Sequence, residues 1–229
     1  DKFDLVIVGG GITGAAVAYI AAARGLSVAL FEKKDYGGAT SAATSKLIHG
    51  GLRYLANGEV KLVRESLRER RILGNIAPNF VYPLPFIMPM YKRWRGNIWK
   101  MLMGMFLYDL LSYDKKDTWD RSKKLQNHRL INHRKTIRVE PNLKMKDLRN
   151  GFWFFDYQSI FPERLTLAFI KSAADYGACV SNYTPVEGFI FGEGKKITGV
   201  KVKDLFTGRE KTVHADLVIN CGGTWADKI

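Results

Sequence analysis

The sequence predicts an α/β fold with a parallel central sheet, and three observations near its beginning support this. The run "DLVIVGG" (4–10) has the β-branched composition of a buried strand and ends in glycines. The next segment, "ITGAAVAYIAAARG" (12–25), is rich in alanine, as expected of a helix that Gly25 closes. "LSVALFE" (26–32) again has the composition of a strand, so residues 4–32 form a predicted strand–helix–strand unit.

The later elements alternate helices with extended segments. We expect helices at 59–76, 94–112 and 162–177, and strands at 150–157 and within 178–194, 196–208 and 210–223. Three prolines within 82–91 allow only an edge strand or an extended connector there. The helix at 59–76 is expected to carry Val60, Val63, Leu67 and Ile72 near one face, and the polar, basic residues 115–149 to form a connector.

Size and composition limit the possible functions. The chain has 229 residues, 46% of them hydrophobic, which suits one large or two small globular domains. Its two cysteines, Cys179 and Cys221, lie far apart, which favours a reducing compartment and predicts neither a disulfide scaffold nor a metal site. The net charge of +14 favours an acidic partner, such as an anionic substrate, an anionic membrane surface or nucleic acid.

The expected location follows from the apolar segments. No apolar run reaches the roughly 20 residues that a membrane-spanning helix needs. Because Asp1 directly precedes a strand, we expect an initiator methionine or a processed leader to be absent from this sequence. The expected location is the cytoplasm or the periphery of the inner membrane face. No nucleic-acid partner is expected, since no basic recognition helix or aromatic strand motif of a known type is present.

A glycine motif joins the first strand to the first helix. Gly9, Gly11 and Gly14 have the spacing G-x-G-x-x-G, in which the glycines allow a tight turn, close approach of a pyrophosphate and close helix packing. Glu32 ends the second strand, where a carboxylate can accept hydrogen bonds from a ribose diol. The motif therefore predicts a Rossmann-like dinucleotide site for FAD or NAD rather than NADP.

A second pair of glycines favours FAD. The segment "ADLVINCGGTWAD" (215–227) runs from a predicted strand into Gly222 and Gly223. A second stretch of bare backbone suits a cofactor that binds in an extended form, with its flavin far from its adenosine. Our central prediction is that the two glycine segments lie together and contact one dinucleotide.

Three blocks of the sequence resemble one family of flavoproteins. "DLVIVGGGITGAAVA", "ATSAATSKLIHGGLRYL" and "LVINCGGTWAD" are similar to segments of the FAD-dependent glycerol-3-phosphate dehydrogenases, which share the fold of D-amino-acid-oxidase-like flavoproteins. The resemblance implies oxidation of sn-glycerol 3-phosphate to dihydroxyacetone phosphate by hydride transfer to FAD, with quinone or another acceptor taking the electrons. It also implies a role in glycerol metabolism.

The resemblance carries binding roles to particular positions. Gly9, Gly11, Gly14 and Glu32 match the ADP-binding part; the positions that match cofactor contacts beyond it are Thr40, Ser41, Ser45, Lys46, Leu47, His49, Gly50, Gly51, Val186, Gly222 and Gly223. Arg53 and Tyr54 match the substrate side, with His49, as the catalytic candidates.

The chemistry of "TSKLIHGGLRYL" (44–55) agrees with these roles. Gly50 and Gly51 would let the backbone lie against the flavin ring, and N–H groups nearby could donate to its heteroatoms. Arg53 offers a planar donor fork to phosphate oxygens, and Tyr54 can donate to a hydroxyl. His49 can orient the substrate or act as a base. Alternatively, Arg53 and Lys46 are ordinary surface side chains, and His49 is a structurally hydrogen-bonded histidine.

The expected domain organisation has three parts. Residues 1–80 and 150–229 are assigned to an FAD-binding domain, and 81–149 to an inserted connector on the substrate or membrane side, part of a second substrate-side subdomain. The resemblance implies that the family's C-terminal remainder is absent from this chain. Two alternatives to the dehydrogenase stay open: a non-catalytic fragment that binds FAD or a membrane, and a sister flavoenzyme acting on a 2-hydroxy acid or an amino acid.

A membrane contact is also predicted. The aromatic residues Trp94, Trp99 and Tyr108, beside Lys92, Arg93, Arg95 and Lys100, resemble an interfacial anchor. An amphipathic helix packed on its own domain is the alternative.

Overall fold

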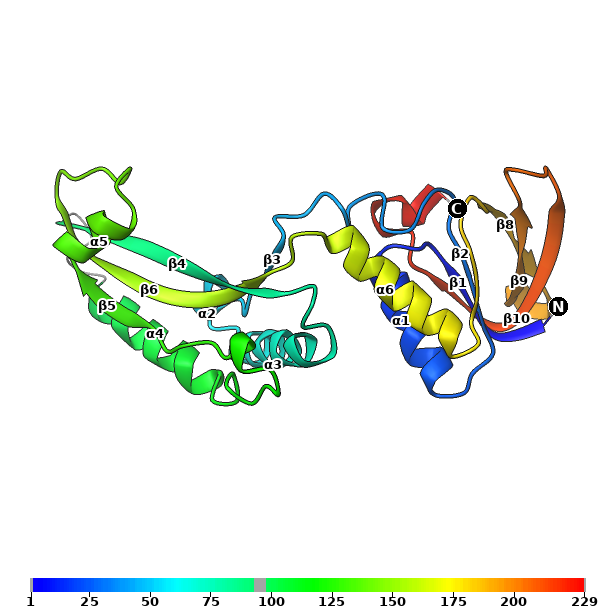
Figure 1. Ribbon diagram of the computed structural model, residues 1–229. Coiled ribbons are helices and arrows are strands. Elements are labelled where there is room, and N and C mark those ends of the chain that lie inside the picture. The colour runs from blue at the N-terminus through cyan, green and yellow to red at the C-terminus, as the bar shows by residue number, and fades with distance from the viewer. Residues whose placement is uncertain (1, 93–97, 229) are drawn as a thin grey trace. The chain divides into compact units, whose positions relative to one another are not determined.

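The structure is a computed structural model that describes residues 2–92 and 98–228, and the chain divides into two compact units. Unit 1 comprises Asp1–Ser45 and Phe161–Ile229, and unit 2 comprises Lys46–Ile160. Each unit has a β-sheet with helices packed on it, which confirms the predicted α/β class (Figure 1).

The sheet of unit 1 combines parallel and antiparallel strands. Its order is β7-β2-β1-β10-β9-β8, with β7, β2, β1 and β10 parallel and β9 and β8 added antiparallel. The strands are β1 (Lys2–Val8), β2 (Val28–Phe31), β7 (Cys179–Ser181), β8 (Val186–Phe191), β9 (Ile197–Lys203) and β10 (Glu210–Asn220). The parallel central sheet with additional antiparallel strands is as predicted.

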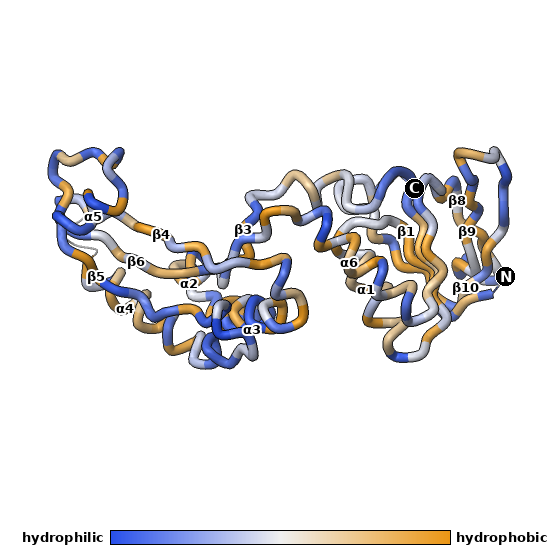
Figure 2. The backbone as a smooth tube through the Cα atoms, viewed as in Figure 1, coloured by the Kyte–Doolittle hydropathy of each residue, from blue (hydrophilic) through white to orange (hydrophobic). Residues whose placement is uncertain are grey.

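Both faces of this sheet are covered. Helices α1 (Ile12–Ala23) and α6 (Pro162–Asp175) lie side by side on one face, where small alanines of α1 pack against Leu5 and Ile7. On the other face, valines of β9 and β10 pack against Val6 and Val8. The inner strands are accordingly among the most hydrophobic parts of the chain (Figure 2). Two short 3-10 helices, η3 (Glu193–Lys195) and η4 (Gly223–Lys228), complete the unit.

The sheet of unit 2 is built around one long strand. The strands are β3 (Leu47–Ile48), β4 (Tyr82–Tyr91), β5 (Arg129–Asn132) and β6 (Leu148–Gln158). β4 pairs with β6 along its length, while β3 and β5 pair with the other side of β6. β4 is thus an edge strand, as its prolines predicted. Pro83, Pro85 and Pro89 all occupy alternate positions, so their nitrogens point to the side that β6 does not use.

The helices of unit 2 differ from prediction in several places. They are α2 (Leu52–Leu55), α3 (Val60–Ile76), α4 (Ile98–Leu111), α5 (His133–Val139) and the 3-10 helix η2 (Arg121–Lys123). Residues 115–149 are therefore more than a connector, since they contain η2, β5 and α5. The buried face of α3 consists of Val63, Leu67, Arg70 and Gly74, whereas Val60 is exposed and Ile72 only half-buried.

The compact units do not end where the predicted domains end. β4 and β6 belong to one sheet, so the structure does not separate 81–149 from 150–158. The assignment of 1–80 and 150–229 to one FAD-binding domain stays a prediction. Among the residues that the structure describes, none of the helices has the length and apolar character that crossing a bilayer requires.

Candidate functional site

The predicted glycine motif lies at the carboxyl edge of the parallel strands in unit 1. β1 runs into Gly9, β2 into Glu32, and β10 into Cys221 and Gly222. The N–H of Cys221 donates to the carbonyl of Val8 (2.7 Å), so the two glycine segments are adjacent, as predicted. Ligands of open α/β sheets bind beyond this edge, because the loops and helix N-termini gather there.

The surroundings of the three glycines in the motif differ in how strongly they exclude a side chain. A Cβ on Gly9, whose φ is +106°, would lie 2.6 Å from the carbonyl oxygen of Cys221. A Cβ on Gly14 would lie 2.0 Å from the carbonyl oxygen of Gly9. A Cβ on Gly11 would approach only the Ser41 Oγ, at 3.2 Å, apart from its own chain neighbours. Packing against the backbone thus requires Gly9 and Gly14, whereas at Gly11 a Cβ would meet only a side-chain hydroxyl.

Glu32 is held beside this turn by two backbone donors. Its Oε2 accepts the N–H of Gly10 (2.7 Å), and its Oε1 accepts the N–H of Lys34 (2.9 Å). Each carboxylate oxygen can accept a further hydrogen bond, so the position stays compatible with a ribose diol. Helix α1 begins at the same turn, where the first N–H groups of a helix lack acceptors within it, and Ser41 Oγ accepts that of Ile12 (2.9 Å).

The other predicted contacts of unit 1 lie near this edge or in the loop that leaves it. The N–H of Thr184 donates to the carbonyl of Glu32 (2.7 Å), which brings the segment before Val186, the first residue of β8, to the end of β2. The N–H of Gly222 donates to Asn220 Oδ1 (2.9 Å), and Gly223 opens η4 with a φ of +59°. Thr40 is exposed, as is Ser45, the last residue of the unit's first segment.

The remaining predicted residues lie in unit 2, on a short strand, a turn and a short helix. Leu47 pairs with Gln158, and the carbonyl of Lys46 accepts the N–H of Ser159 (2.8 Å). The turn that follows consists of His49, Gly50 and Gly51, and α2 then carries the exposed Arg53 and the partly exposed Tyr54. The rings of His49 and Tyr54 lie 6.4 Å apart.

The two glycines of this turn are required by the protein's own side chains. A Cβ on Gly50 would lie 2.1 Å from Leu67 Cδ2 and 2.3 Å from the Tyr108 hydroxyl. A Cβ on Gly51, whose φ is +76°, would lie 2.7 Å from the ring of Tyr54. A flavin is therefore not needed to explain why both are glycine.

The N–H groups of this turn also have partners within the protein. The N–H of Gly50 donates to Asp156 Oδ1 (3.2 Å), and that of Gly51 to His49 Nδ1 (3.2 Å). Donation to the flavin therefore stays a prediction for other N–H groups nearby. An imidazole that accepts at Nδ1 carries its proton on Nε2 when neutral, so His49 offers a donor at Nε2 in this arrangement.

A buried polar cluster beside the turn was not predicted from the sequence. Arg70 and Asp156 form an ion pair, 2% and 3% exposed respectively, to which the hydroxyl of Tyr108 is hydrogen-bonded. The predicted role of Tyr108 in a membrane anchor is wrong, because the side chain is 3% exposed. Trp99, Lys92 and Lys100 are exposed, whereas the predicted anchor residues 93–95 lie outside the described residues.

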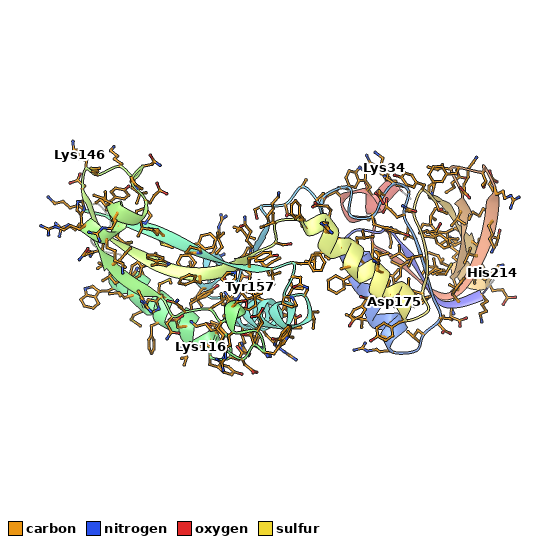
Figure 3. The ribbon with its side chains drawn as sticks, viewed as in Figure 1. Lys34, Lys116, Lys146, Tyr157, Asp175 and His214 are labelled. Atoms are coloured by element: carbon orange, nitrogen blue, oxygen red, sulfur yellow. The ribbon has the colours of Figure 1, made fainter. Side chains whose placement is uncertain are left out.

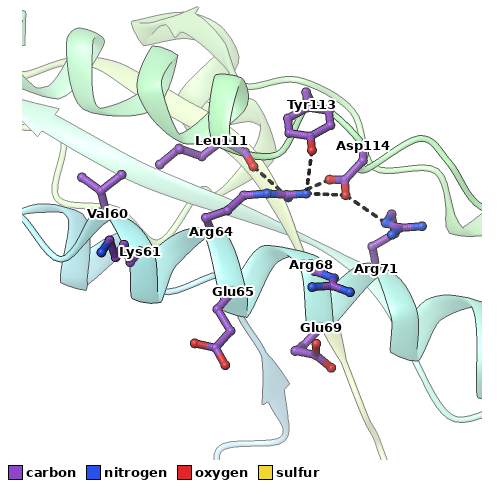
Figure 4. Close-up of a pocket in the computed structure, with 10 residues that line it drawn as sticks. All are labelled: Val60, Lys61, Arg64, Glu65, Arg68, Glu69, Arg71, Leu111, Tyr113 and Asp114. Carbon is purple, nitrogen blue, oxygen red and sulfur yellow. Dashed lines mark hydrogen bonds and ion pairs between the residues drawn. The ribbon is translucent and has the colours of Figure 1, made fainter.

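A second charged cluster lines a surface groove of about 780 Å³ beside α3. Arg64 donates to both carboxylate oxygens of Asp114 (2.9 and 2.7 Å), and Arg71 donates to the same carboxylate (3.0 Å), as Figure 4 shows. The hydrogen bonds from Arg64 hold the pKa of Asp114 below its usual value. These ion pairs hold the chain after α4 against α3. None of the predicted site residues lines the groove.

Comparison with known proteins identifies the family. The sequence model described as DAO, FAD dependent oxidoreductase, matches residues 4–229. The chain belongs to this family. Its members depend on FAD, which confirms the cofactor expected from the sequence. No three His, Cys, Asp or Glu side chains within 2–92 and 98–228 are placed to hold a metal ion.

The curated relatives agree with the resemblance seen in the sequence. The chain is 39% identical to the glycerol-3-phosphate dehydrogenase of Synechocystis over 99% of its length, and 35% identical to the aerobic glycerol-3-phosphate dehydrogenase of Staphylococcus aureus over 100%. It spans 40% of the length of each of these relatives.

Solved structures show the same fold. A glycerol-3-phosphate dehydrogenase from Bacillus halodurans complexed with FAD is similar over the whole chain, with a TM-score of 0.72 and 29% identity, and the match covers 36% of that chain. L-proline dehydrogenase from P. horikoshii gives a TM-score of 0.74 at 20% identity, covering 100% of this chain and 55% of that one, which shows the fold alone.

Proposed function

We propose that this chain is the FAD-binding part of a glycerol-3-phosphate dehydrogenase that oxidises sn-glycerol 3-phosphate to dihydroxyacetone phosphate, with electrons passing to quinone or another acceptor. The observation that carries the proposal is its identity of 35–39% to proteins of this name over 99–100% of the chain. The substrate, the acceptor and the activity of the whole protein are proposals on this basis.

In this proposal, unit 1 binds the ADP portion of FAD. The backbone at Gly11 and the N-terminus of α1 would receive the pyrophosphate, and Glu32 the ribose hydroxyls. The further proposed contacts are Gly9, Gly14, Thr40, Ser41, Ser45, Val186, Gly222 and Gly223 in unit 1, and Lys46, Leu47, His49, Gly50 and Gly51 in unit 2. Bound FAD supplies the acceptor for a hydride from the substrate carbon.

The substrate would be held by side chains that follow the Gly50–Gly51 turn. Arg53 is exposed on α2, and its guanidinium fork suits the phosphate of the substrate. Tyr54 can donate to a substrate hydroxyl. The hydrogen bond from Gly51 to Nδ1 favours the role of His49 as an orienting donor at Nε2 over its role as a base.

The test uses the full-length protein loaded with FAD. Under anaerobic conditions, glycerol 3-phosphate should bleach the flavin absorbance, whereas L-proline, glycine and a 2-hydroxy acid should not. Bleaching by an amino acid or a 2-hydroxy acid alone would identify a sister flavoenzyme. Binding of FAD without reduction by any of them would favour the non-catalytic alternative.

Arg53→Ala tests the substrate site separately. Loss of one charge-assisted partner of the phosphate should lower kcat/KM for glycerol 3-phosphate by an amount equivalent to about 2–4 kcal/mol, without releasing FAD. Arg68→Ala, which removes an exposed arginine of α3, is the matched control. Equal kinetics for the two variants would remove Arg53 from the site.

A peripheral membrane contact is a second proposal, carried by one face of α4. Trp99, Met103, Phe106 and Leu110 recur at helical spacing and are 58–74% exposed. With a net charge of +14, such a face suits anionic lipid. The full-length protein should float with anionic but not with zwitterionic vesicles, and Phe106→Asp should abolish this whereas Leu217→Asp in unit 1 should not. Equal flotation of both variants would contradict the assignment.

A further inference from the structure

The turn that carries the proposed catalytic residues is tied to one buried carboxylate. Oδ1 of Asp156 accepts hydrogen bonds from Arg70 Nη1, from the Tyr108 hydroxyl (3.0 Å) and from the N–H of Gly50 (3.2 Å). Arg70 Nη1 also donates to the Tyr108 hydroxyl (3.2 Å). The four residues come from α3, α4, β6 and the turn, so tertiary folding alone brings them together.

Two members of this cluster, Tyr108 and Gly50, are constrained by their surroundings. Burial raises the pKa of Tyr108, so its hydroxyl keeps its proton and remains a donor to Asp156. Gly50 cannot move toward α3 or α4, because Leu67 and the Tyr108 hydroxyl fill the space where its Cβ would lie. The N–H of Gly50 is thus fixed in both direction and distance.

Stability alone does not account well for such a cluster. Burying an ion pair removes two charges from water, and apolar residues of the same volume are often as stabilising. What apolar residues could not provide is an acceptor for the N–H of Gly50. What Arg70, Tyr108 and Asp156 provide beyond stability is therefore a fixed geometry of the turn.

We propose that Asp156, with Arg70 and Tyr108, is a positioning group that sets the Gly50–Gly51 turn and, through it, His49, Arg53 and Tyr54. The proposal rests on the proposed function for what the turn presents, but not for the hydrogen bond itself. Gly51, in the left-handed conformation, leads directly into α2, so a shift of Gly50 is transmitted to Arg53 and Tyr54. None of the three positioning residues needs to touch substrate or FAD.

The matched variants are Tyr108→Phe and Tyr157→Phe. Both remove one buried hydroxyl, but the Tyr157 hydroxyl donates to the carbonyl of Lys123 and to no residue of the turn. Figure 3 shows Tyr157 near α3, where it packs against Gly74. Asp156→Asn, which keeps the shape and removes the charge, is the third variant.

The first measurement is hydrogen–deuterium exchange of the peptide covering 47–55 in the full-length protein without substrate. Asp156→Asn and Tyr108→Phe should speed exchange of the Gly50 amide about tenfold or more, since the first weakens its acceptor and the second removes a hydrogen bond that holds this acceptor in place. Tyr157→Phe should leave this peptide unchanged. Equal exchange in Tyr108→Phe and Tyr157→Phe would overturn the proposal, and Tyr108→Phe keeps it testable if Asp156→Asn does not fold.

The second measurement separates positioning from stability. At a temperature well below each melting temperature, Tyr108→Phe should lower kcat and raise the KM for glycerol 3-phosphate, while Tyr157→Phe should lower only the melting temperature. Faster exchange of the 47–55 peptide in Tyr108→Phe, together with unchanged kinetics, would reject the positioning role. A wild-type protein that ignores glycerol 3-phosphate would instead reject the proposed function, with the exchange result still standing.

Discussion

The two glycine turns of this protein look alike in sequence and differ in what makes them glycine. At Gly11 in unit 1, the position of a Cβ is approached, among the described residues and apart from the chain neighbours of Gly11, only by the Ser41 Oγ at 3.2 Å. At Gly50 in unit 2, the position of a Cβ is filled by Leu67 and Tyr108. In the first turn, backbone packing requires Gly9 and Gly14 but not Gly11, whereas neighbouring side chains require both glycines of the second turn.

The comparison shows that bare backbone does not by itself mark a binding site. A position in a motif can require glycine because a ligand approaches the backbone or because a neighbouring side chain fills the space. Only the surrounding atoms distinguish these two causes. In unit 2 the N–H groups of Gly50 and Gly51 already have acceptors within the protein, so the proposed function assigns the chemistry to the side chains of His49, Arg53 and Tyr54.

The largest expected effect is that of Gly50→Ala. The added methyl would lie 2.1 Å from Leu67 Cδ2, so the core of unit 2 must shift, at a cost of about 2–3 kcal/mol in the free energy of unfolding. Denaturant unfolding measures it. Gly104→Ala, a glycine of α4 with no atom within 4 Å of the Cβ position, should raise stability instead by up to about 1 kcal/mol. A neutral Gly50→Ala would undo the comparison.

Gly11→Ala should act on the cofactor and not on the fold. The backbone of Gly11 (φ −72°, ψ 179°) suits any residue, so the unfolding free energy of the FAD-free protein should change by less than about 0.5 kcal/mol. Affinity for FAD should fall at least tenfold, about 1.4 kcal/mol, because the methyl occupies the pyrophosphate space. Titration of FAD against protein fluorescence measures this. Unchanged affinity would mean that no cofactor approaches the backbone at Gly11.

Arg64→Met tests a polar contact that shapes unit 2 without serving the turn. Loss of the paired hydrogen bonds to the half-buried Asp114 should cost about 1–2 kcal/mol at pH 7, allowing for partial exposure. Since Arg64 lowers the folded-state pKa of Asp114, this stabilisation is present above about pH 4 and is lost as the pH falls through the lowered value. Unfolding curves of both proteins should converge in acid.

The control for this pair lies in unit 1. Lys203 and Glu210 form an exposed ion pair, so Lys203→Met should change stability by less than about 0.5 kcal/mol at any pH. An equal loss in the two variants would mean that burial does not distinguish the pairs.

The smallest expected effect is that of substitutions at His49, which distinguish its two possible roles. Asn at this position can still accept the N–H of Gly51, and Gln can still donate where Nε2 lies. If His49 orients the substrate as a donor, His49→Gln should keep kcat/KM within about tenfold of the wild type, and His49→Asn should lower it further. If His49 is a base, both should lose activity equally, together with the acidic limb of the pH profile.

Much of unit 1 could be predicted because its signals are local. The strand composition of 4–10 and 26–32, the alanine-rich helix between them and the glycine spacing all lie within one short stretch. The adjacency of Gly9 and Gly222 followed from two strands that end in glycine. Parallel pairing then puts both ends at one edge of the sheet.

The organisation of unit 2 was harder to predict from the sequence, because it depends on contacts between residues that are distant in the chain. β5 is a strand of four residues with no apolar alternation, and it forms through pairing with β6. In the sequence, Arg70 is one of many charged residues of the helix and does not stand out. In the structure it lies on the same buried face as Val63 and Leu67. Its partner Asp156 lies 86 residues away, a lone acid in the aromatic strand "NGFWFFDY". That lone acid was the available signal.

The most direct test of the account is an absorbance spectrum of the full-length protein, before and after anaerobic addition of glycerol 3-phosphate. The protein should show the two absorbance bands of bound oxidised flavin, and both should disappear when the substrate is added. A protein that neither contains flavin nor takes it up from added FAD would contradict the central claim that the turn at Gly11 receives a dinucleotide.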